Sequence, residues 1–386
     1  MDSKPTAIFA LPDKLGGVFS FVQDLFRVRS ASALPYRAVR VTSVQEGTPP
    51  AGDPISEHDL RFQHHLPKEN VYSVVNRLAA LMGDGDGVLV SNDWLELAMA
   101  HWHPPRRAVV NIVHGDFDYY YGLARRHDAV IDAFVTYTTR VHERLLELLP
   151  HRRDQIHLIR YGVPIPAPVR RVTGQPLRVL YAGRLHEHKG VLLLPVIDQH
   201  LRDRRIDVEW TVHGEGPAAE SLRAAWPPSE RVRYSGYRPI DEVRALYLEH
   251  DVFVLPSRFE ALPVALLEAG AAGVVPVVSD LPSGIPEVVM PRRTGYRVPI
   301  GDSSGFAEAI ACLHDNRDEL QRLSESVRAL VSATFDARKN AAAYEALFAD
   351  WQRLRRPRAK TRVPYGSRLD RPWIPNTLVR AIRKVM

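Results

Sequence analysis

The chain has 386 residues, about twice the usual size of one domain, so we expect two domains. It is 45% hydrophobic and 25% charged with a net charge of +6, which is typical of a soluble globular protein. The single cysteine, Cys312, excludes a disulfide framework and a cysteine-based zinc site, and no run resembles a membrane span or a signal peptide, so we expect a cytoplasmic protein.

Short apolar, β-branched runs alternate with helical patterns along most of the chain, which predicts parallel sheets built from βαβ units. We expect strands at 6–11, 38–42, 87–91, 108–113, 133–136, 156–161, 178–182, 208–213, 232–235, 252–256 and 274–279, and helices at 240–248 and 264–272 among others. The proline-rich stretch 164–176 is typical of a linker. The sequence therefore predicts an α/β protein with one domain over 1–165 and a second over 175–335.

The C-terminal part differs in charge from the rest. A long helix is expected at 336–356, and four prolines prevent the tail 357–386 from being one helix. Residues 352–386 carry eleven Lys or Arg and one acid, a net charge of +10, so the rest of the chain sums to −4. The last piece, 376–386, is expected to form a short amphipathic helix with Leu378, Ile382 and Val385 on one side.

The stretch 254–272 is the most informative part of the sequence. A predicted strand ends in Pro-Ser, Glu260 begins a segment that becomes helical, and Glu268 follows eight residues later. Two carboxylates at this spacing suit the hydroxyl-rich ends of an extended molecule such as a nucleotide sugar, whose diphosphate would face the helix N-terminus. The alternative is that both are solvated helix residues.

Two cations and several glycines follow other strands of the second domain. Arg184 and Lys189 come just after its first strand, at the end where open α/β sheets bind ligands, and could neutralise a diphosphate. They could equally be solvated surface charges. Gly214, Gly216 and Gly236 would allow a ligand to approach the backbone, although a partial G-x-G is a weak signal.

Taken in order, GRL…KG, GEGP, SGY and PSRFE-x7-E resemble the retaining glycosyltransferases of family 4 over about 179–296. The resemblance implies the GT-B fold: two Rossmann-like domains facing across a cleft, with the helix 336–356 returning to the first. It implies that Glu260 contacts the donor sugar, Glu268 the ribose, and Arg184 and Lys189 the diphosphate. The other donor-binding positions that it implies are Gly214, Gly216, Gly236, Tyr237, Leu262, Pro263 and Val264. Where the family usually has Gly after the first Glu, this chain has Ala261, and Pro263 removes one N–H donor.

The first domain fits the same resemblance more loosely. Gly16 and Gly17, after Lys14, match the loop that closes over the donor phosphates, although an ordinary strand–helix turn is the alternative. His114 matches a histidine near the donor sugar, a catalytic position, whereas a lone histidine is more often structural. Asn92 and Asp93 follow another strand, and with Lys14 they are expected on the acceptor side.

The resemblance implies a retaining transfer of a hexose from a UDP- or GDP-sugar to a glycan or lipid-linked acceptor. We expect no metal or other cofactor, because fixed cations would stabilise the leaving diphosphate, and Asp84 and Asp86 suit a turn better than a metal site. Alternatives are glycosylation of a soluble small molecule, an epimerase or phosphorylase on the same fold, and a catalytically silent sugar-nucleotide binder.

The basic tail is expected to bind the anionic inner face of the plasma membrane, which suits assembly of a cell-envelope polysaccharide. A solvated tail, or one folded back on the acidic body, is the alternative. The tail has few interleaved aromatic residues, so nucleic acid is not expected as a partner.

Overall fold

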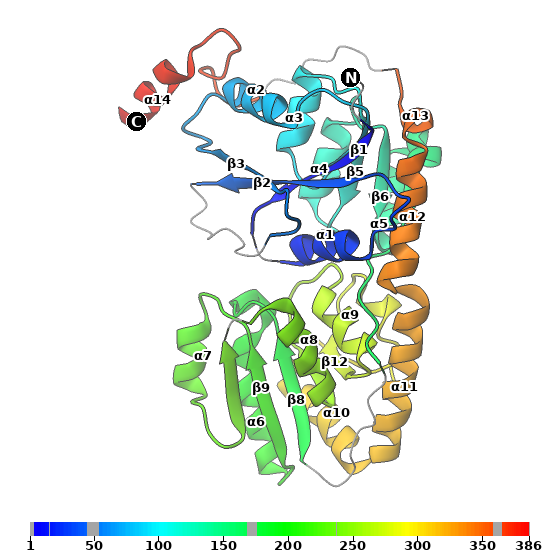
Figure 1. The fold of residues 1–386 in the computed structure, drawn as a ribbon. Coiled ribbons are helices and arrows are strands. Elements are labelled where there is room, and N and C mark those ends of the chain that lie inside the picture. The colour runs from blue at the N-terminus through cyan, green and yellow to red at the C-terminus, as the bar shows by residue number, and fades with distance from the viewer. Residues whose placement is uncertain are drawn as a thin grey trace. The chain divides into compact units, whose positions relative to one another are not determined.

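The computed structural model describes residues 4–14, 16–44, 54–167, 176–236, 238–357 and 365–385. The chain divides into two compact units, each built on a parallel sheet (Figure 1). Unit 1 comprises Met1–Gly162 and Arg338–Met386, and unit 2 comprises Val163–Ala337. The predicted linker at 164–176 lies partly on residues 168–175, outside the described part.

Unit 1 contains a parallel sheet of seven strands in the order β3-β2-β1-β4-β5-β6-β7. Its strands are β1 (Thr6–Pro12), β2 (Tyr36–Ser43), β3 (Leu60–His64), β4 (Gly87–Ser91), β5 (Ala108–Val113), β6 (Ala133–Thr136) and β7 (Ile156–Leu158). Its first helices are α1 (Gly17–Val28), α2 (Val71–Met82), α3 (Leu95–Trp102), α4 (Asp118–Arg126) and α5 (Thr139–Leu148).

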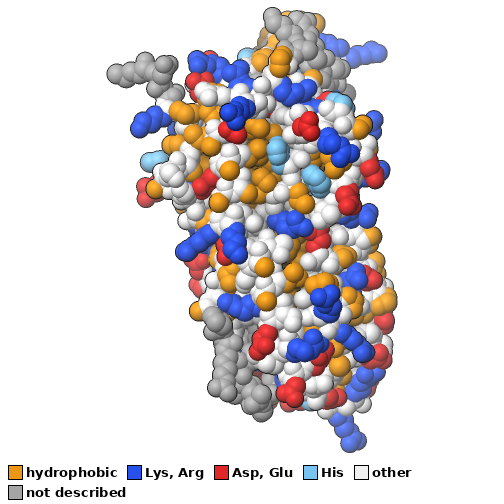
Figure 2. Space-filling view, turned by 90° about the vertical axis from the view of Figure 1, so that its right-hand side faces the viewer, with side chains coloured by type: hydrophobic (Ala, Val, Ile, Leu, Met, Phe, Trp, Pro, Cys, Tyr) orange, Lys and Arg blue, Asp and Glu red, His pale blue; other side chains and the backbone are white. Residues whose placement is uncertain are grey.

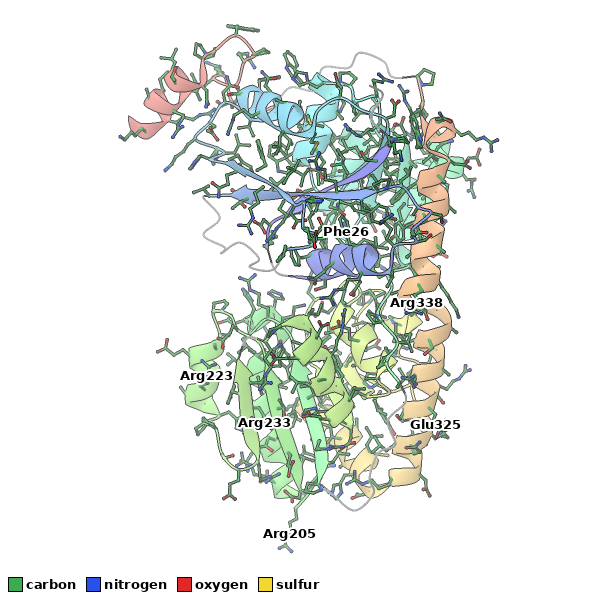
Figure 3. All side chains as sticks on the ribbon, viewed as in Figure 1. Phe26, Arg205, Arg223, Arg233, Glu325 and Arg338 are labelled. Atoms are coloured by element: carbon green, nitrogen blue, oxygen red, sulfur yellow. The ribbon has the colours of Figure 1, made fainter. Side chains whose placement is uncertain are left out.

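Both faces of this sheet are buried, as β1 illustrates. Ile8 and Ala10 belong to a core shared with α2 and α3. Phe9, between them, points to the other face and packs edge-on against Phe26 of α1, with ring centroids 5.3 Å apart (Figure 3). Successive side chains of a strand point to opposite faces. A strand buried on both faces therefore reads as a continuous apolar run, which is why these strands are visible in the sequence.

Unit 2 contains a parallel sheet of six strands in the order β10-β9-β8-β11-β12-β13. The strands are β8 (Leu177–Ala182), β9 (Val208–His213), β10 (Val232–Gly236), β11 (Val252–Leu255), β12 (Val275–Ser279) and β13 (Tyr296–Val298). The helices are α6 (Leu194–Asp203), α7 (Ala219–Ala225), α8 (Ile240–Glu249), α9 (Val264–Ala271), α10 (Ser303–Asp315) and α11 (Arg317–Thr334). Short 3-10 turns lie at Glu187–Lys189, Val191–Leu193 and Ile285–Glu287.

All eleven predicted strands and the two quoted helices are present, so the predicted class, two Rossmann-like α/β parts, is confirmed. The sequence analysis missed β3 and β13, which are the edge strands of the two sheets. β3 buries only Phe62 and His64, and β13 has three residues, of which only Val298 is buried. Neither gives the apolar run that marks a central strand.

The predicted segment 336–356 forms two helices, α12 (Ala337–Ala349) and α13 (Trp351–Leu354), separated at Asp350. The described end of the tail, 365–385, packs on unit 1 and ends in α14 (Asn376–Val385), where an amphipathic helix was expected. Within the described residues, every helix is too short or too polar to cross a membrane.

Candidate functional site

The topology of unit 2 points to the carboxyl ends of β8 and β11. From β8 the chain proceeds outward through β9 to β10, then returns to β11 on the other side of β8 and continues outward to β13. The loops after β8 and β11 therefore leave the sheet in opposite directions. An open α/β sheet binds its ligands at such a switch point. The predicted residues Arg184, Lys189 and Glu260 all lie on these two loops.

Lys189 and Glu260 form an ion pair at this point. Lys189 Nζ lies 2.6 Å from Glu260 Oε1, which also accepts a hydrogen bond from Ser257 Oγ at 2.7 Å. The Glu260 side chain is 7% exposed and that of Lys189 is 24% exposed. An ammonium group has three donors, so Lys189 can hold the carboxylate and still donate to a ligand.

Backbone contacts fix the position of this pair. Arg258 N donates to His188 O at 2.8 Å, which joins the turn before Lys189 to the loop after β11. Gly190 has φ +68°, and a Cβ built there would lie 1.9 Å from Pro256 O. Both the left-handed backbone and the lack of space require glycine at this position.

Arg184 follows β8 on the same loop as Lys189, and its side chain is exposed. Its carbonyl accepts a hydrogen bond from the hydroxyl of Tyr181 at 2.9 Å, which holds the start of the loop. Burial, and the charge of Glu260, raise the pKa of Tyr181 well above its ordinary value, so the phenol stays protonated and donates. The exposed guanidinium is thus carried on a fixed backbone.

The glycines after β9 leave room for the backbone of a neighbouring loop. A Cβ on Gly214 would lie 2.0 Å from Gly183 O, and one on Gly216 would lie 2.3 Å from Leu185 O. Their missing side chains admit the backbone of the loop after β8, which also bonds through Leu185 N to Glu215 O at 3.0 Å. Gly236 has φ +65° at the end of β10, and Tyr237 lies outside the described residues.

Glu260 lies in the loop before the helix, in agreement with the helix predicted at 264–272. Helix α9 begins at Val264, with Pro263 before it and no side-chain cap. A proline before the first turn supplies no N–H and fixes an extended entry. Of the three predicted donor-binding residues here, the Leu262 side chain is buried, whereas those of Pro263 and Val264 are partly exposed to solvent.

Glu268 lies within α9 and is held by α8. Arg244 Nε donates to Glu268 Oε1 at 3.3 Å, and the Tyr247 hydroxyl donates to Oε2 at 3.4 Å. Burial and the nearby carboxylate raise the pKa of Tyr247, which keeps its proton. The two glutamates of E-x7-E are therefore held by different partners, Glu260 by the loop after β8 and Glu268 by α8.

The same topological feature recurs in unit 1, between β1 and β4. There Asn92, directly after β4, accepts a hydrogen bond through Oδ1 from His114 Nε2 at 2.6 Å. Its amide group donates to Ala10 O at 2.7 Å, which establishes which end of the side chain faces the histidine. His114 Nδ1 is hydrogen-bonded to the hydroxyl of Tyr161.

These contacts define the state of His114. Because Asn92 presents its oxygen, Nε2 carries the proton and Nδ1 accepts from the Tyr161 hydroxyl. Burial lowers the pKa of His114 to about 3, so the ring is neutral. With both nitrogens engaged, this arrangement suits a positioning group rather than one that carries a proton.

Asp93 is held by a second set of contacts beside Asn92. The backbone N–H groups of Asn92 and Asp93 both donate to Glu96 Oε1, at 2.8 and 2.7 Å, and the Tyr119 hydroxyl donates to Asp93 Oδ1. Burial and the charge of Asp93 raise the pKa of Glu96 to about 7. The D-x-x-E spacing of Asp93 and Glu96 is a helix-capping signal that could have revealed this contact.

The predicted glycine loop follows β1. Lys14 is exposed, and a Cβ on Gly16 would meet nothing within 4 Å, while Gly17 starts α1. Just before them, Asp13 accepts from Arg40 Nη2 at 2.6 Å and from Arg40 Nε at 2.9 Å. Both side chains are almost completely buried, so this pair is structural. Sequence reasoning missed it, together with Tyr161, Ser257 and Arg244.

Among the described residues, no group of three or more His, Cys, Asp or Glu side chains is placed to hold a metal ion.

Comparison with known proteins gives the class of this site. The family model of the "Glycosyl transferases group 1" matches residues 176–316, the part that contains Arg184, Lys189, Glu260 and Glu268. A putative colanic acid biosynthesis glycosyltransferase, WcaL of Escherichia coli, is 33% identical over 198 residues, which are 48% of each chain. The protein thus spans about half the length of this curated relative.

Solved structures resemble the whole fold. The sucrose-phosphate synthase of Thermosynechococcus elongatus matches with a TM-score of 0.71 at 18% identity, covering 90% of this chain and 99% of the other. Anabaena Alr3699/HepE, in complex with UDP and glucose, matches with a TM-score of 0.70 at 15% identity, covering 89% and 99%. Residues 176–316 therefore match the model of the glycosyl transferases group 1, and the chain has the fold of these solved structures, the GT-B fold, as predicted.

Proposed function

We propose that the protein is a retaining glycosyltransferase that moves a hexose from a UDP- or GDP-sugar to a glycan or lipid-linked acceptor. The observation that carries the proposal is the Lys189–Glu260 pair at the β8/β11 switch point of a group 1 domain. The relative with colanic acid biosynthesis in its name supports polysaccharide assembly as the setting. The neighbour solved with UDP and glucose supports a uridine nucleotide donor.

In this proposal, Arg184 and Lys189 bind the diphosphate, and the open N-terminus of α9 adds its dipole. Glu260 binds hydroxyls of the sugar, and Glu268, held by Arg244, binds the ribose. The bond between the anomeric carbon and the diphosphate oxygen breaks, and the acceptor oxygen bonds to the same face. The acceptor proton passes to the departing phosphate, whose charge the two cations stabilise without a metal.

Lys14, Asn92 and Asp93 of unit 1 are proposed to serve the acceptor side, and the backbone N–H groups of Gly16 and Gly17 suit phosphate oxygens. His114 is proposed to hold Asn92 in position rather than to bond a ligand itself, since both nitrogens of its neutral ring are hydrogen-bonded within the protein.

The test is hydrolysis of a panel of UDP- and GDP-hexoses by the full chain in EDTA, without acceptor. We expect release of nucleoside diphosphate, and a free sugar that has the donor's anomeric configuration when NMR detects it before mutarotation. Lys189→Ala is expected to lower the rate by about 100-fold, and Arg258→Ala, an exposed cation on the same loop, to leave it unchanged. An inverted sugar would contradict retention, and dependence on Mg²⁺ would contradict the metal-free route. If the protein bound a nucleotide sugar but released no nucleoside diphosphate, the result would favour the alternative of a catalytically silent sugar-nucleotide binder.

A further inference from the structure

Helix α14 is fixed to unit 1 by a buried polar contact. Asp370 is 2% exposed and accepts from Val71 N at 3.0 Å, Ser367 N at 2.7 Å and Arg383 Nη2 at 2.6 Å. Arg383 also donates to the carbonyls of Pro67 and Glu69, both at 2.7 Å. The one acid of the tail and one of its cations thus serve to hold α14 beside the start of α2 (Figure 1).

A second set of contacts fixes the orientation of the helix. Asn376 Oδ1 accepts from Asn70 N at 2.8 Å, and Asn70 Nδ2 donates to the carbonyls of Arg371 and Ile374 at 2.9 and 2.8 Å. Val379, one turn after Asn376, is completely buried. Asn376, Val379 and Arg383 follow the spacing of one helix face, so this face is the docked one.

A different face of α14 carries exposed apolar side chains. Leu378 is 52% exposed and Ile382, four residues later and on the same side, is 37% exposed. Trp373, just before the helix, is 76% exposed, the most exposed large apolar side chain among the described residues. Docking through Val379 and Arg383 therefore does not cover the Leu378–Ile382 face.

The exposed charges of the described tail, 365–384, are of one sign. Arg368, Arg380 and Lys384 are exposed, and the only acid of 365–384, Asp370, is buried and paired with Arg383. On the face drawn in Figure 2, by contrast, acidic and basic side chains are interspersed. Arg380 and Lys384 lie on the side of α14 opposite Leu378 and Ile382. An exposed apolar strip with cations on the opposite, polar face is the pattern of a helix that lies in the interface of an anionic bilayer.

The geometry points to the Leu378–Ile382 face of α14, together with the exposed Trp373 just before the helix, as a docking surface for an anionic lipid bilayer. The apolar side chains enter the headgroup region, Arg380 and Lys384 on the polar face attract the anionic headgroups, and the Asp370–Arg383 pair holds unit 1 at a fixed orientation to the membrane. This inference extends the proposed function, because a lipid-linked acceptor is presented at such a surface, but it does not depend on transferase activity.

The test is co-sedimentation of the full chain with vesicles of phosphatidylglycerol and phosphatidylcholine, and with vesicles of phosphatidylcholine alone. We expect binding to the anionic vesicles that Leu378→Ser/Ile382→Ser weakens by roughly tenfold or more. Leu192→Ser/Val196→Ser is the matched control, since these exposed apolar residues are also four apart but lie in unit 2. Arg380→Gln/Lys384→Gln is expected to weaken binding roughly fivefold per charge, and Arg204→Gln/Arg205→Gln, at the end of α6, to have no effect (Figure 3).

A second measurement does not depend on affinity. The Trp373 emission, obtained as the difference between wild type and Trp373→Phe, is expected to shift to shorter wavelength when anionic vesicles are added. Absence of this shift, absence of wild-type binding, or equal binding by wild type and Leu378→Ser/Ile382→Ser would overturn the proposal. The proposal would also be overturned if the protein formed a dimer in solution and Leu378→Ser/Ile382→Ser dissociated it. A second copy of the chain would then be the occupant of this face.

Discussion

Each sheet has a charged pair near its topological switch point, β1/β4 in unit 1 and β8/β11 in unit 2, but the two pairs are exposed to different degrees. In unit 1, Asp13 follows β1 and pairs with Arg40, and the two side chains are 1% and 0% exposed. In unit 2, Lys189 follows β8 and pairs with Glu260, and the two are 24% and 7% exposed. One pair is sealed inside the protein, whereas the cation of the other reaches solvent.

This difference separates structural from ligand-binding charges. A buried ion pair must satisfy all of its donors within the protein, and Arg40 does so through Asp13 and, at 3.5 Å, Asp59. A partly exposed ammonium group such as that of Lys189 keeps donors for a ligand. Its pairing also contributes less to the free energy of unfolding than a buried pair does, because water can replace the partner. The fold is thus the same in both units, while the degree of exposure decides which charges can take part in chemistry.

The largest effect on stability is expected at the sealed pair. Arg40→Ala leaves Asp13 buried without its cation, which should cost about 3–5 kcal/mol of unfolding free energy. Arg106→Ala removes an exposed pair with Asp86, whose distance is 3.0 Å, and should cost less than about 1 kcal/mol. Denaturant unfolding of both variants measures the contrast, and equal costs would remove the distinction between buried and exposed pairs in unit 1.

The next effect concerns the turn that carries Lys189. Gly190→Ala combines a left-handed backbone with a clash against Pro256 O, and we expect a loss of about 2–4 kcal/mol. Gly301→Ala is the control, because Gly301 has φ +82° but open space at Cβ, so it isolates the backbone cost of about 1–2 kcal/mol. If thermal unfolding shows the same loss for both variants, the close packing of the two loops contributes nothing.

The smallest effect is the pH dependence of unit 1. Burial lowers the pKa of His114 and of His127 to about 3, below the unfolded value of 6.5. The unfolded state therefore binds more protons between pH 6.5 and 3, and stability falls as the pH falls through this window. Glu96 acts in the opposite direction. Its pKa is raised from 4.5 to about 7 in the folded protein, so the folded state binds more protons between pH 7 and 4.5 and stability rises as the pH falls through this window.

His114→Asn should therefore flatten the dependence of unfolding free energy on pH between 6.5 and 4.5, by up to about 1.4 kcal/mol per pH unit. Glu96→Gln should steepen it over the same range. An unchanged slope in His114→Asn would show that this histidine titrates normally in the folded protein.

The sequence predicted features that depend on neighbours along the chain. The central strands show as apolar runs because both faces are buried, and the loops after β8 and β11 contain recognisable motifs. The pairings themselves were not predictable, since Lys189 and Glu260 are 71 residues apart, Tyr161 and His114 are 47 apart, and Asp13 and Arg40 are 27 apart. Such pairs depend on the order of strands in the sheet, which local patterns do not encode.

The glycines also show that the sequence does not reveal which segments pack together. The sequence identified Gly214 and Gly216 as places of close backbone approach, which is correct, but not what approaches them. The structure shows that the loop at Gly183–Leu185 does so. A missing side chain indicates crowding, and only the fold reveals which segment causes it.

The central claim is that Lys189 is a ligand-binding cation that keeps donors for a ligand while it is paired with Glu260. Calorimetric titration of UDP and GDP in EDTA tests it most directly. For the nucleotide that binds, we predict about 10- to 100-fold weaker affinity in Lys189→Ala, because a charge-assisted hydrogen bond contributes about 1.5–3 kcal/mol. Arg258→Ala should bind as wild type does, and Glu260→Gln should bind at least as tightly, because it removes a negative charge next to the ammonium group that holds the diphosphate. Unchanged affinity in Lys189→Ala, or an equal loss in Arg258→Ala, would contradict the account.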